Sequence, residues 1–418
     1  MMGNWKTCTI GDLGRVVGGA TPSTKKAENY DGGTIAWITP KDLAGFSGRF
    51  ISRGERNITE QGLKSCSTQL MPAHTVLFSS RAPIGYIAIA EQEVCTNQGF
   101  KSVVPDEKTD YMFLYYLLKY NKEKIENLGS GTTFKEVSGS TMRGIEVRVP
   151  ETIEEQQRIA SVLSALDDKI EKNTEVNENL EEQAVVLFRS WFSAFSLSPN
   201  SPRVSSEFGE IPEDFAVIKV GNLPMLVTDY VANGSFAALK ANVNLYQAPN
   251  YAYFIRNTDL KSGSFGVFVD KHSYEFLSKS TLYGGEIIIS NVGDVGSVFL
   301  CPKLGGRMTL GNNIIMLRPK DDHLRYYLYI WFKYLQGQAL IQGIKGGSAQ
   351  PKFNKTDFKN TSVLIPPKDI LSRFHETVAP MFETISQRQT ETARLADLRD
   401  TLLPKLMSGE IDISNLDL

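Results

Sequence analysis

Two segments of the 418-residue chain carry apolar residues at heptad spacing, the pattern of helices that pack along a narrow stripe. In the first segment the stripe consists of Ile159, Leu163, Leu166, Ile170, Leu180, Ala184, Leu187 and Trp191. In the second segment the same register recurs at Phe374, Val378, Met381, Ile385, Leu395, Arg399, Leu402 and Leu406. Polar residues interrupt the middle of both stripes, at Asn173 and Asn177 and at Arg388 and Thr392. The shared register predicts two long helices.

These two helices are expected to pack on each other as a coiled coil, because a narrow stripe buries well only against a similar helix. Buried polar residues at the centre would fix the alignment at some cost in stability. Antiparallel packing needs only the short linker 196–214, whereas parallel packing would require that linker to run back along the whole helix, so antiparallel packing and a pseudo-two-fold axis are favoured. The alternative is two ordinary amphipathic helices on separate domains, and Arg399, at an expected apolar position, is the weakest point of the coiled-coil interpretation.

The segments before each helix repeat one another. The stretch "VLFSSRAPIGYIAI" (76–89) aligns without a gap on "IIISNVGDVGSVFL" (287–300), which places Ser79 on Ser290 and Gly85 on Gly296. Three further pairs match: "WKTCTIGDL" with "FAVIKVGNL", "WITPKDL" with "FIRNTDL", and "TNQGFKSVVP" with "GNNIIMLRP", the last with Asn97 opposite Asn312. Short β-branched runs bounded by Gly and Pro predict strands.

Each copy continues with an aromatic-rich helical stretch (111–127 and 323–342), a glycine-rich loop ("GSGTTFK", 129–135, and "GGSAQPK", 346–352) and a final strand. The expected fold class is α+β, with two homologous mixed α/β domains alternating with the two long helices. The predicted boundaries are 1–150 and 199–366 for the domains, 151–198 and 367–410 for the helices, and 411–418 for a C-terminal tail.

Charge follows the same alternation. The net charge of the chain is −2, with 41% hydrophobic and 22% charged residues, as in a globular protein. The two predicted domains carry a small basic excess and the two helical segments an acidic one, and the glutamates Glu154, Glu155, Glu181 and Glu182 are expected to lie on solvated helix faces. The N-terminal sequence has no signal-like apolar stretch, and no run approaches a membrane span, which predicts a cytoplasmic protein.

The sequence offers no motif for catalysis or for metal binding. The four cysteines are far apart and the four histidines are scattered, so neither a disulfide framework nor a zinc site is expected. The glycines around Lys345 do not form a P-loop, and Ile365-Pro366-Pro367 lacks the Asn or Asp of an amino-methyltransferase motif. A duplicated two-lobed enzyme and a protein scaffold that binds no DNA remain the alternatives to a DNA-binding role.

Two basic domains held apart by a helical spacer could each bind one part of a DNA target. A helix of about 40 residues spans roughly 60 Å, on the order of 18 bp of B-DNA. Arg and Lys pair with guanine, Asn and Gln with adenine, and Ser and Thr with either. The candidate DNA-binding residues of the first copy are Ser79, Arg81, Asn97, Gln98, Thr132, Thr133 and Lys135. Those of the second copy are Ser290, Asn291, Asn312, Asn313, Ser348, Gln350 and Lys352. A turn or capping role is the alternative for each of them.

The pattern resembles the specificity subunits of type I restriction–modification systems, and the resemblance covers the whole chain. It is strongest in "GGATPSTKKAENYDGGTIAWITPKDL" (18–43), "SSRAPIGYIAI" (79–89) and "VPETIEEQQRIASVLSALDDKI" (149–170). The resemblance implies two target-recognition domains that each read half of a split DNA target, with spacer helices that set the gap. It further implies a non-catalytic subunit without a cofactor of its own, bound to two methyltransferase subunits and to motor–nuclease subunits.

In that family S-adenosylmethionine, ATP and Mg²⁺ act in the partner subunits.

The second copy departs from the first in two places. The stretch "MLVTDYVANGSF" does not repeat "GGATPS" (18–23), and "IPPKDILSRFHE" is a weakened copy of "VPETIEEQQRIA". The two domains are therefore expected to read different half-sites.

Overall fold

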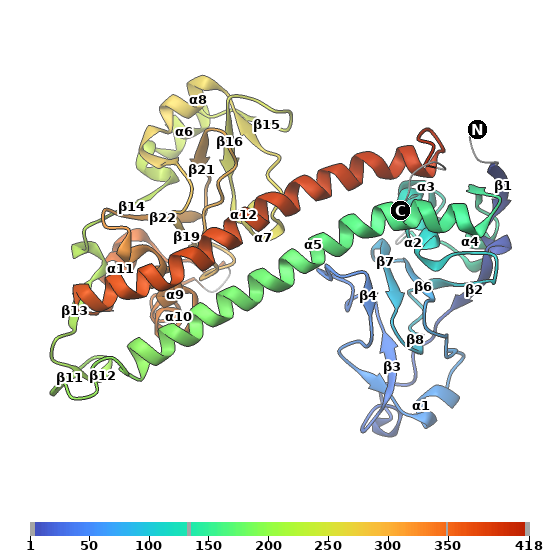
Figure 1. Cartoon of the computed structure of the whole chain (residues 1–418), viewed down its shortest axis with the longest axis horizontal. Coiled ribbons are helices and arrows are strands. Elements are labelled where there is room, and N and C mark those ends of the chain that lie inside the picture. The colour runs from blue at the N-terminus through green and yellow to red at the C-terminus, as the bar shows by residue number, and fades with distance from the viewer. Residues whose placement is uncertain (1–4, 132–134, 348–349, 414–418) are drawn as a thin grey trace. The chain divides into compact units, whose positions relative to one another are not determined.

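A computed structural model describes residues 5–131, 135–347 and 350–413. The chain divides into two units, one formed by residues 1–171 and 395–418 and the other by residues 172–394. The heptad segments are confirmed as helices: α5 spans Ile153–Phe188 and α12 spans Lys368–Met407 (Figure 1). Both helices contribute to both units, because the division between the units falls within each helix. Among the described residues no helix is long and apolar enough to cross a membrane.

Unit 1 is built on a five-stranded sheet of order β2-β9-β6-β7-β4, a three-stranded sheet of order β5-β3-β8 and the pair β1-β10. The strands are β1 (Trp5–Thr9), β2 (Gly14–Gly18), β3 (Ile35–Ile38), β4 (Phe50–Ile51), β5 (Asn57–Ile58), β6 (Val76–Ser80), β7 (Ile84–Ala90), β8 (Val94–Thr96), β9 (Lys101–Pro105) and β10 (Glu146–Pro150). The helices besides α5 are α1 (Glu60–Lys64), α2 (Tyr111–Tyr120), α3 (Lys122–Asn127) and α4 (Gly139–Arg143), with short 3₁₀ turns η1 (Ile10–Asp12) and η2 (Ala27–Asn29).

The apolar run "YMFLYYLL" forms the helix α2, whose residues Phe113 to Leu118 are all buried. A helix that is apolar on all sides must be covered on all sides. Here α2 packs on β6 and β7, and its residues share one hydrophobic cluster with the start of α5 and the end of α12. The helix begins where the carboxylate of Asp110 accepts a hydrogen bond from the N–H of Phe113 at 2.8 Å.

Unit 2 is built on a four-stranded sheet of order β14-β22-β19-β20, a five-stranded sheet of order β15-β17-β16-β21-β18 and the pairs β13-β23 and β11-β12. The strands are β11 (Arg203–Ser206), β12 (Gly209–Pro212), β13 (Ala216–Lys219), β14 (Met225–Asp229), β15 (Leu245–Tyr246), β16 (Ala252–Ile255), β17 (Phe268–Val269), β18 (Thr281–Leu282), β19 (Ile287–Ser290), β20 (Val298–Leu300), β21 (Met308–Leu310), β22 (Ile314–Pro319) and β23 (Ser362–Ile365). The helices are α6 (Phe236–Asn242), α7 (Asn257–Ser262), α8 (Lys271–Phe276), α9 (His323–Lys333), α10 (Leu335–Gly343) and α11 (Lys355–Asn360). A π-helical turn, η3 (Arg189–Ser193), follows α5, and 3₁₀ turns η4 (Val220–Asn222), η5 (Tyr230–Asn233) and η6 (Ser278–Ser280) join further elements.

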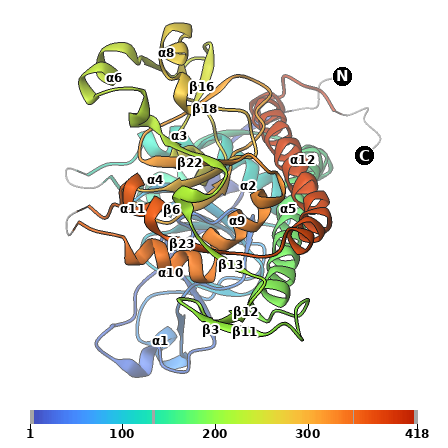
Figure 2. The same ribbon diagram turned by 90° about the vertical axis from the view of Figure 1, so that its left-hand side faces the viewer.

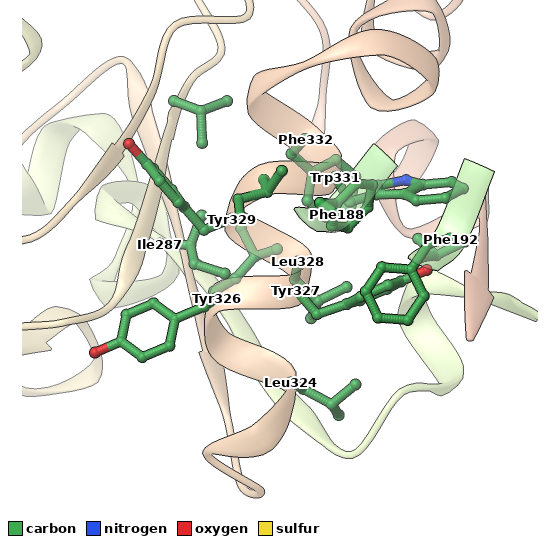
Figure 3. Close-up of a cluster of buried hydrophobic side chains, with 14 of the residues drawn as sticks. Phe188, Phe192, Ile287, Leu324, Tyr326, Tyr327, Leu328, Tyr329, Trp331 and Phe332 are labelled. Atoms are coloured by element: carbon green, nitrogen blue, oxygen red, sulfur yellow. The ribbon is translucent and has the colours of Figure 1, made fainter. Parts of the chain in front are cut away.

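The core of unit 2 centres on α9, which packs on β19, β20 and β22. Figure 2 shows the positions of α9, α10 and β22. The aromatic side chains of α9 meet Phe188, the last residue of α5, and Phe192 of η3 (Figure 3). The ring of Phe192 lies 4.9 Å from the ring of Tyr327 in an edge-to-face arrangement and at the same distance from the ring of Phe374 of α12. Such aromatic pairs add to the stabilisation that burial alone provides.

The internal repeat is visible in the strand pairings of the two units. Antiparallel pairing of β2 with β9 and of β6 with β7 in unit 1 recurs as β14 with β22 and β19 with β20 in unit 2. The closing pairs β1-β10 and β13-β23 also correspond, as do the parallel pairs β3-β8 and β16-β21. The units diverge after β2 and β14: unit 1 continues in an extended loop, whereas unit 2 forms η5 and α6.

Candidate nucleic-acid interface

Three loops of unit 1 meet at one end of its main sheet. This first loop cluster comprises residues 81–83, 97–99 and the described part of 129–137. The N–H of Ser80 donates to the carbonyl of Gly99 at 2.7 Å, and the N–H of Val137 donates to the carbonyl of Ser80 at 3.0 Å. Ser130 and Glu136 close the third loop by a reciprocal pair of backbone hydrogen bonds of 3.0 and 2.9 Å. Backbone hydrogen bonds therefore hold the three loops together.

Unit 2 has the same arrangement. Its second loop cluster comprises residues 291–297, 311–313 and the described part of 344–353. The N–H of Asn291 donates to the carbonyl of Asn313 at 3.1 Å, and the N–H of Phe353 donates to the carbonyl of Asn291 at 3.0 Å. Gly346 and Lys352 close the third loop with hydrogen bonds of 2.8 and 2.9 Å. Two loop clusters with one hydrogen-bond pattern thus carry different side chains.

The predicted residues of the first cluster differ in accessibility. Ser79 is fully buried: its hydroxyl donates to the carbonyl of Pro83 and accepts from the N–H of Tyr86, both at 2.8 Å. Ser79 therefore holds the turn and is not placed to reach a base. Asn97 is half-buried and caps its own loop by accepting from the N–H of Gly99 at 2.8 Å.

Three predicted residues of the first cluster are accessible. Gln98 and Lys135 are exposed, and the side chain of Arg81 is 35% exposed. The Arg81 guanidinium lies 3.6 Å from the carboxylate of Glu136, which also pairs with Lys101 at 3.3 Å. An exposed ion pair of this kind contributes little to stability, so the Arg81 guanidinium is available to exchange Glu136 for a ligand. The predicted residues Thr132 and Thr133 lie outside the described residues.

The predicted residues of the second cluster also differ in accessibility. Ser290 is fully buried and Asn291 is half-buried, with its side-chain amide donating to the carbonyl of Phe353 at 3.3 Å. Four predicted residues are exposed: Asn312, Asn313, Gln350 and Lys352. Asn313 adopts a left-handed backbone conformation (φ 65°), which Asn tolerates better than most residues. The predicted residue Ser348 lies outside the described residues.

The backbone hydrogen bonds correct two residue equivalences drawn from the sequence. The third loop closes at Glu136 in unit 1 and at Lys352 in unit 2, so Lys352 corresponds to Glu136 and not to Lys135. Similarly, the carbonyls of Gly99 and Asn313 accept equivalent bonds, which makes Gln98 the counterpart of Asn312. The glycine-rich loops have no hydrophobic period, so the sequence alone could not fix their register. An acidic residue in one cluster is thus a basic residue in the other.

The predicted core positions of the long helices are buried or half-buried in both units. In unit 1 Ile159 and Leu163 of α5 share a hydrophobic cluster with Leu403, Leu406 and Met407 of α12. In unit 2 Ala184 and Phe188 of α5 share one with Phe374, Val378 and Ile385 of α12. The remaining predicted positions are half-buried: Leu166, Ile170, Leu180, Leu187, Met381, Leu395 and Leu402.

Arg399, the charged residue in the apolar stripe, has a specific partner. Its guanidinium donates to the carboxylate of Asp167 of α5 at 2.7 Å, and the hydroxyl of Tyr116 donates to the other carboxylate oxygen, also at 2.7 Å. Asp167 is 4% exposed. Burial and the Asp167 charge raise the pKa of Tyr116 well above its ordinary value, so this hydroxyl stays protonated as a donor.

The polar centre of the stripes is also paired, within unit 2. The side-chain amide of Asn173 donates to the carboxylate of Glu391 at 2.8 Å and lies 3.4 Å from the hydroxyl of Thr392. Its oxygen accepts from the guanidinium of Arg388 at 2.8 Å. Asn173 thus contacts Arg388 and Thr392, the two polar residues of α12 that the sequence places opposite Asn173 and Asn177.

Two polar contacts between domain and helix were not predicted from the sequence. In unit 1 the buried guanidinium of Arg49 binds Glu171 through two nitrogens, at 3.0 and 2.8 Å, and also binds Asp168. Burial alone would lower the pKa of Arg49, but the hydrogen bonds to these carboxylates raise it above the ordinary value. Arg49 lies in a short loop-like stretch, "SGRF", that has no period to indicate burial.

In unit 2 Glu181 of α5 makes the corresponding polar contact between helix and domain. The prediction that Glu181 lies on a solvated face is wrong: its carboxylate accepts from Tyr329 at 2.7 Å, Lys333 at 2.5 Å and Tyr334 at 3.2 Å. The side chain of Glu181 is only 22% exposed. Both domains are therefore joined to α5 by carboxylates of that helix.

The described residues contain no group of three or more His, Cys, Asp or Glu side chains that could hold a metal ion. The four cysteines are free thiols, and burial raises the pKa of Cys95 to about 11, which makes it a poor nucleophile near neutral pH.

Two related domains with matched loop clusters, each packed on segments of the same two long helices, define a duplicated two-domain protein. The sequence model described as "Type I restriction modification DNA specificity domain" matches residues 2–182 and 228–394, which is most of the chain. The chain therefore belongs to the specificity subunits of type I restriction–modification systems.

Individual relatives agree with this assignment. The chain is 36% identical to the type I restriction enzyme MjaIX specificity subunit of Methanocaldococcus jannaschii over 99% of this chain and 95% of that protein. It is 25% identical to the HindI specificity subunit of Haemophilus influenzae over 72% of this chain and 77% of that protein. The crystal structure of a type I system S subunit from M. genitalium matches with a TM-score of 0.57 at 18% identity, covering 97% of this chain and 96% of that one, which shows the shared fold.

Proposed function

We propose that this chain is the non-catalytic, sequence-specific DNA-recognition subunit of a type I restriction–modification complex, and that each domain reads one half of a bipartite double-stranded target. The observation that carries the proposal is the recurrence of one loop framework with different exposed side chains in two units. A shared framework suits a common mode of docking on DNA, while different polar side chains suit different base sequences.

The accessible residues are the proposed readers. In the first domain these are Arg81, Gln98 and Lys135, and in the second they are Asn312, Asn313, Gln350 and Lys352. Arg81 is suited to guanine, and the amides to adenine. Ser79 and Ser290 are omitted because both are fully buried. Asn97 and Asn291 are omitted because their half-buried side-chain amides are hydrogen-bonded to the loop backbone. Thr132, Thr133 and Ser348 remain predictions from the sequence.

The long helices are the proposed spacer. Within unit 2, the earlier residue of α5 meets the later residue of α12: Asn173 meets Arg388, and Phe188 meets Phe374. In unit 1 Asp167 of α5 meets Arg399 of α12. This order of contacts supports an antiparallel coiled coil, which would relate the two domains by a pseudo-two-fold axis. The polar contacts of Asn173 would then fix the register, and the length of the helices would set the unread gap in the target.

The proposed partners follow from membership in the family. Two methyltransferase subunits would dock on the helices and supply S-adenosylmethionine chemistry, and motor–nuclease subunits would use ATP and Mg²⁺ in the full complex. The chain itself would contribute recognition alone. Purified chain with S-adenosylmethionine, ATP, Mg²⁺ and target DNA should neither methylate nor cleave it, and turnover by the isolated chain would instead support a duplicated enzyme.

Exchange of the first domain tests the proposal. Residues 1–150 are replaced by the matching domain of a related specificity subunit, and the methylated target is determined by methylome sequencing of cells that hold the methyltransferase partner. One half of the target should change while the other half and the gap stay constant. If both halves change together, the domains are not independent readers. If no methylation depends on the chain, a protein-scaffold role is favoured.

A further inference from the structure

The segment 19–26 of unit 1 presents polar side chains on a firmly held backbone. Thr21, Ser23, Thr24, Lys25 and Lys26 are exposed. The backbone between them is anchored by buried side chains: Trp37 donates to the carbonyl of Ala20 at 3.1 Å and Tyr30 to the carbonyl of Pro22 at 2.6 Å. Exposed polar residues on a loop that is fixed by the scaffold are typical of a binding element.

This segment lies directly against the loop that carries Gln98. The N–H of Ala20 donates to the carbonyl of Thr96 at 3.0 Å. A Cβ atom on Gly19 would stand 2.1 Å from the carbonyl oxygen of Thr96 and 2.2 Å from that of Asn97. Only glycine permits this approach, so the placement of the segment beside Gln98 is built into the sequence.

A side-chain hydrogen bond joins the two loops. The hydroxyl of Thr21 donates to the Oε1 atom of Gln98, and both residues are exposed. With Oε1 held by Thr21, the orientation of the amide is fixed. The two N–H groups of Nε2 are then presented as donors to an outside acceptor.

We propose that Thr21 is a positioning residue for Gln98, that Gln98 donates from Nε2 to a base acceptor in the target, and that Lys25 and Lys26 bind the neighbouring phosphates. The proposal rests on the DNA-reading function given above and adds to it a segment outside the three loops of the cluster. In the major groove purine N7, guanine O6 and thymine O4 accept hydrogen bonds, whereas cytosine N4 donates. The base that Gln98 reads should therefore present an acceptor.

The arrangement belongs to the first domain alone. At the corresponding point after β14, unit 2 forms η5 (Tyr230–Asn233) and α6 (Phe236–Asn242). Substitutions in the segment should therefore affect one half of the target, and the other half serves as an internal control in the same measurement.

The test uses the complex of this chain with its methyltransferase subunits and a DNA library randomised at each position of the target. Gln98→Ala should reduce discrimination at one position of the first half-site by about 5- to 100-fold. Thr21→Val should weaken discrimination at the same position, and Thr21→Ser, which keeps the hydroxyl, should restore it. In the Gln98→Ala background Thr21→Val should have no further effect, because Thr21 acts through Gln98.

Two further variants test the donor role of Gln98 and the phosphate contacts of Lys25 and Lys26 separately. Gln98→Glu has the same shape but only acceptor atoms, so the preference at that position should move to a base that donates, cytosine or adenine. The double variant Lys25→Ala/Lys26→Ala should weaken binding to all sequences alike and lower the salt dependence by about two counterions. A changed base preference in this double variant with an unchanged salt dependence would overturn the phosphate assignment.

The outcomes separate the inference from the proposed function. If the wild-type complex shows no sequence preference, the proposed function fails. If the wild-type complex is specific and both Gln98 variants, correctly folded and assembled, keep the wild-type preference at every position, only the inference fails. An equal loss at both half-sites in the Thr21→Val variant would assign Thr21 a purely structural role and also overturn the inference.

Discussion

Asp167 is a buried carboxylate that is stabilised only because it has hydrogen-bond partners. It receives hydrogen bonds from Arg399 and Tyr116, and its side chain is 6% exposed. Removing one partner of a buried pair leaves an unpaired charge and costs about 3–5 kcal/mol, whereas an apolar replacement of both partners is often neutral. Arg399→Leu should therefore lower the free energy of unfolding by about 3 kcal/mol. Adding Asp167→Leu together with Tyr116→Phe, which removes the hydroxyl that donates to Asp167, should recover most of the loss. Urea unfolding measures both, and simple additivity of the two losses would contradict the pairing.

Arg81 is the residue of the first cluster best suited to read guanine. Its partner Glu136 is 39% exposed, so the pair would break at little cost if DNA supplied another acceptor. Arg81→Ala should weaken binding of the complex by about 1–3 kcal/mol and relax the preference at one target position. Titration of the matched and mismatched targets measures this. Equal weakening for all sequences would indicate a phosphate contact, and unchanged affinity would leave Arg81 a loop-stabilising residue.

At the scale of elements, the heptad period was sufficient to predict both long helices and their buried stripe, because burial along a helix follows its repeat. The period could also locate the polar centre, but it could not explain Arg399, since a charge in an apolar stripe is interpretable only with its partner on the other helix. Arg49 and Glu181 were missed for the same reason. The loop clusters were found through the repeat, although their register and the burial of Ser79 and Ser290 depend on backbone hydrogen bonds that no local pattern encodes.

The polar centre makes the register of the helices testable. Three residues inserted in α5 alone, after Asn177, should move the apolar stripe out of phase beyond the insertion and disturb the packing of Asn173 with Arg388 and Glu391. Methylation in cells should fall strongly, and urea unfolding should begin at lower denaturant. A matched insertion of a whole heptad in both helices is the control, because it keeps both stripes in phase. Full activity of the variant with three inserted residues would contradict a register fixed by these contacts.

At the scale of the whole molecule, the proposed function would use the duplication to supply two readers and the helices to set the distance between them. A chain that repeats one loop framework with altered side chains can recognise two different half-sites, and each half can change without the other. The units differ after β2 and β14, where one unit carries the 19–26 segment and the other carries η5 and α6. Specificity would thus evolve by replacing surface segments while the strand pairings and the helix contacts stay the same.

The most direct test of this account is the length of the unread gap. One heptad is inserted after Asn177 in α5 and one after Ile385 in α12, which keeps the stripes in register and lengthens the spacer by about 10 Å. That length corresponds to on the order of 3 bp, and the accompanying turn of about 100° must be absorbed by twist in the protein or the DNA. Methylome sequencing should show the same two half-sites with a gap longer by about 3 bp. A folded, active variant that methylates only the original spacing would contradict the role of the helices as the spacer.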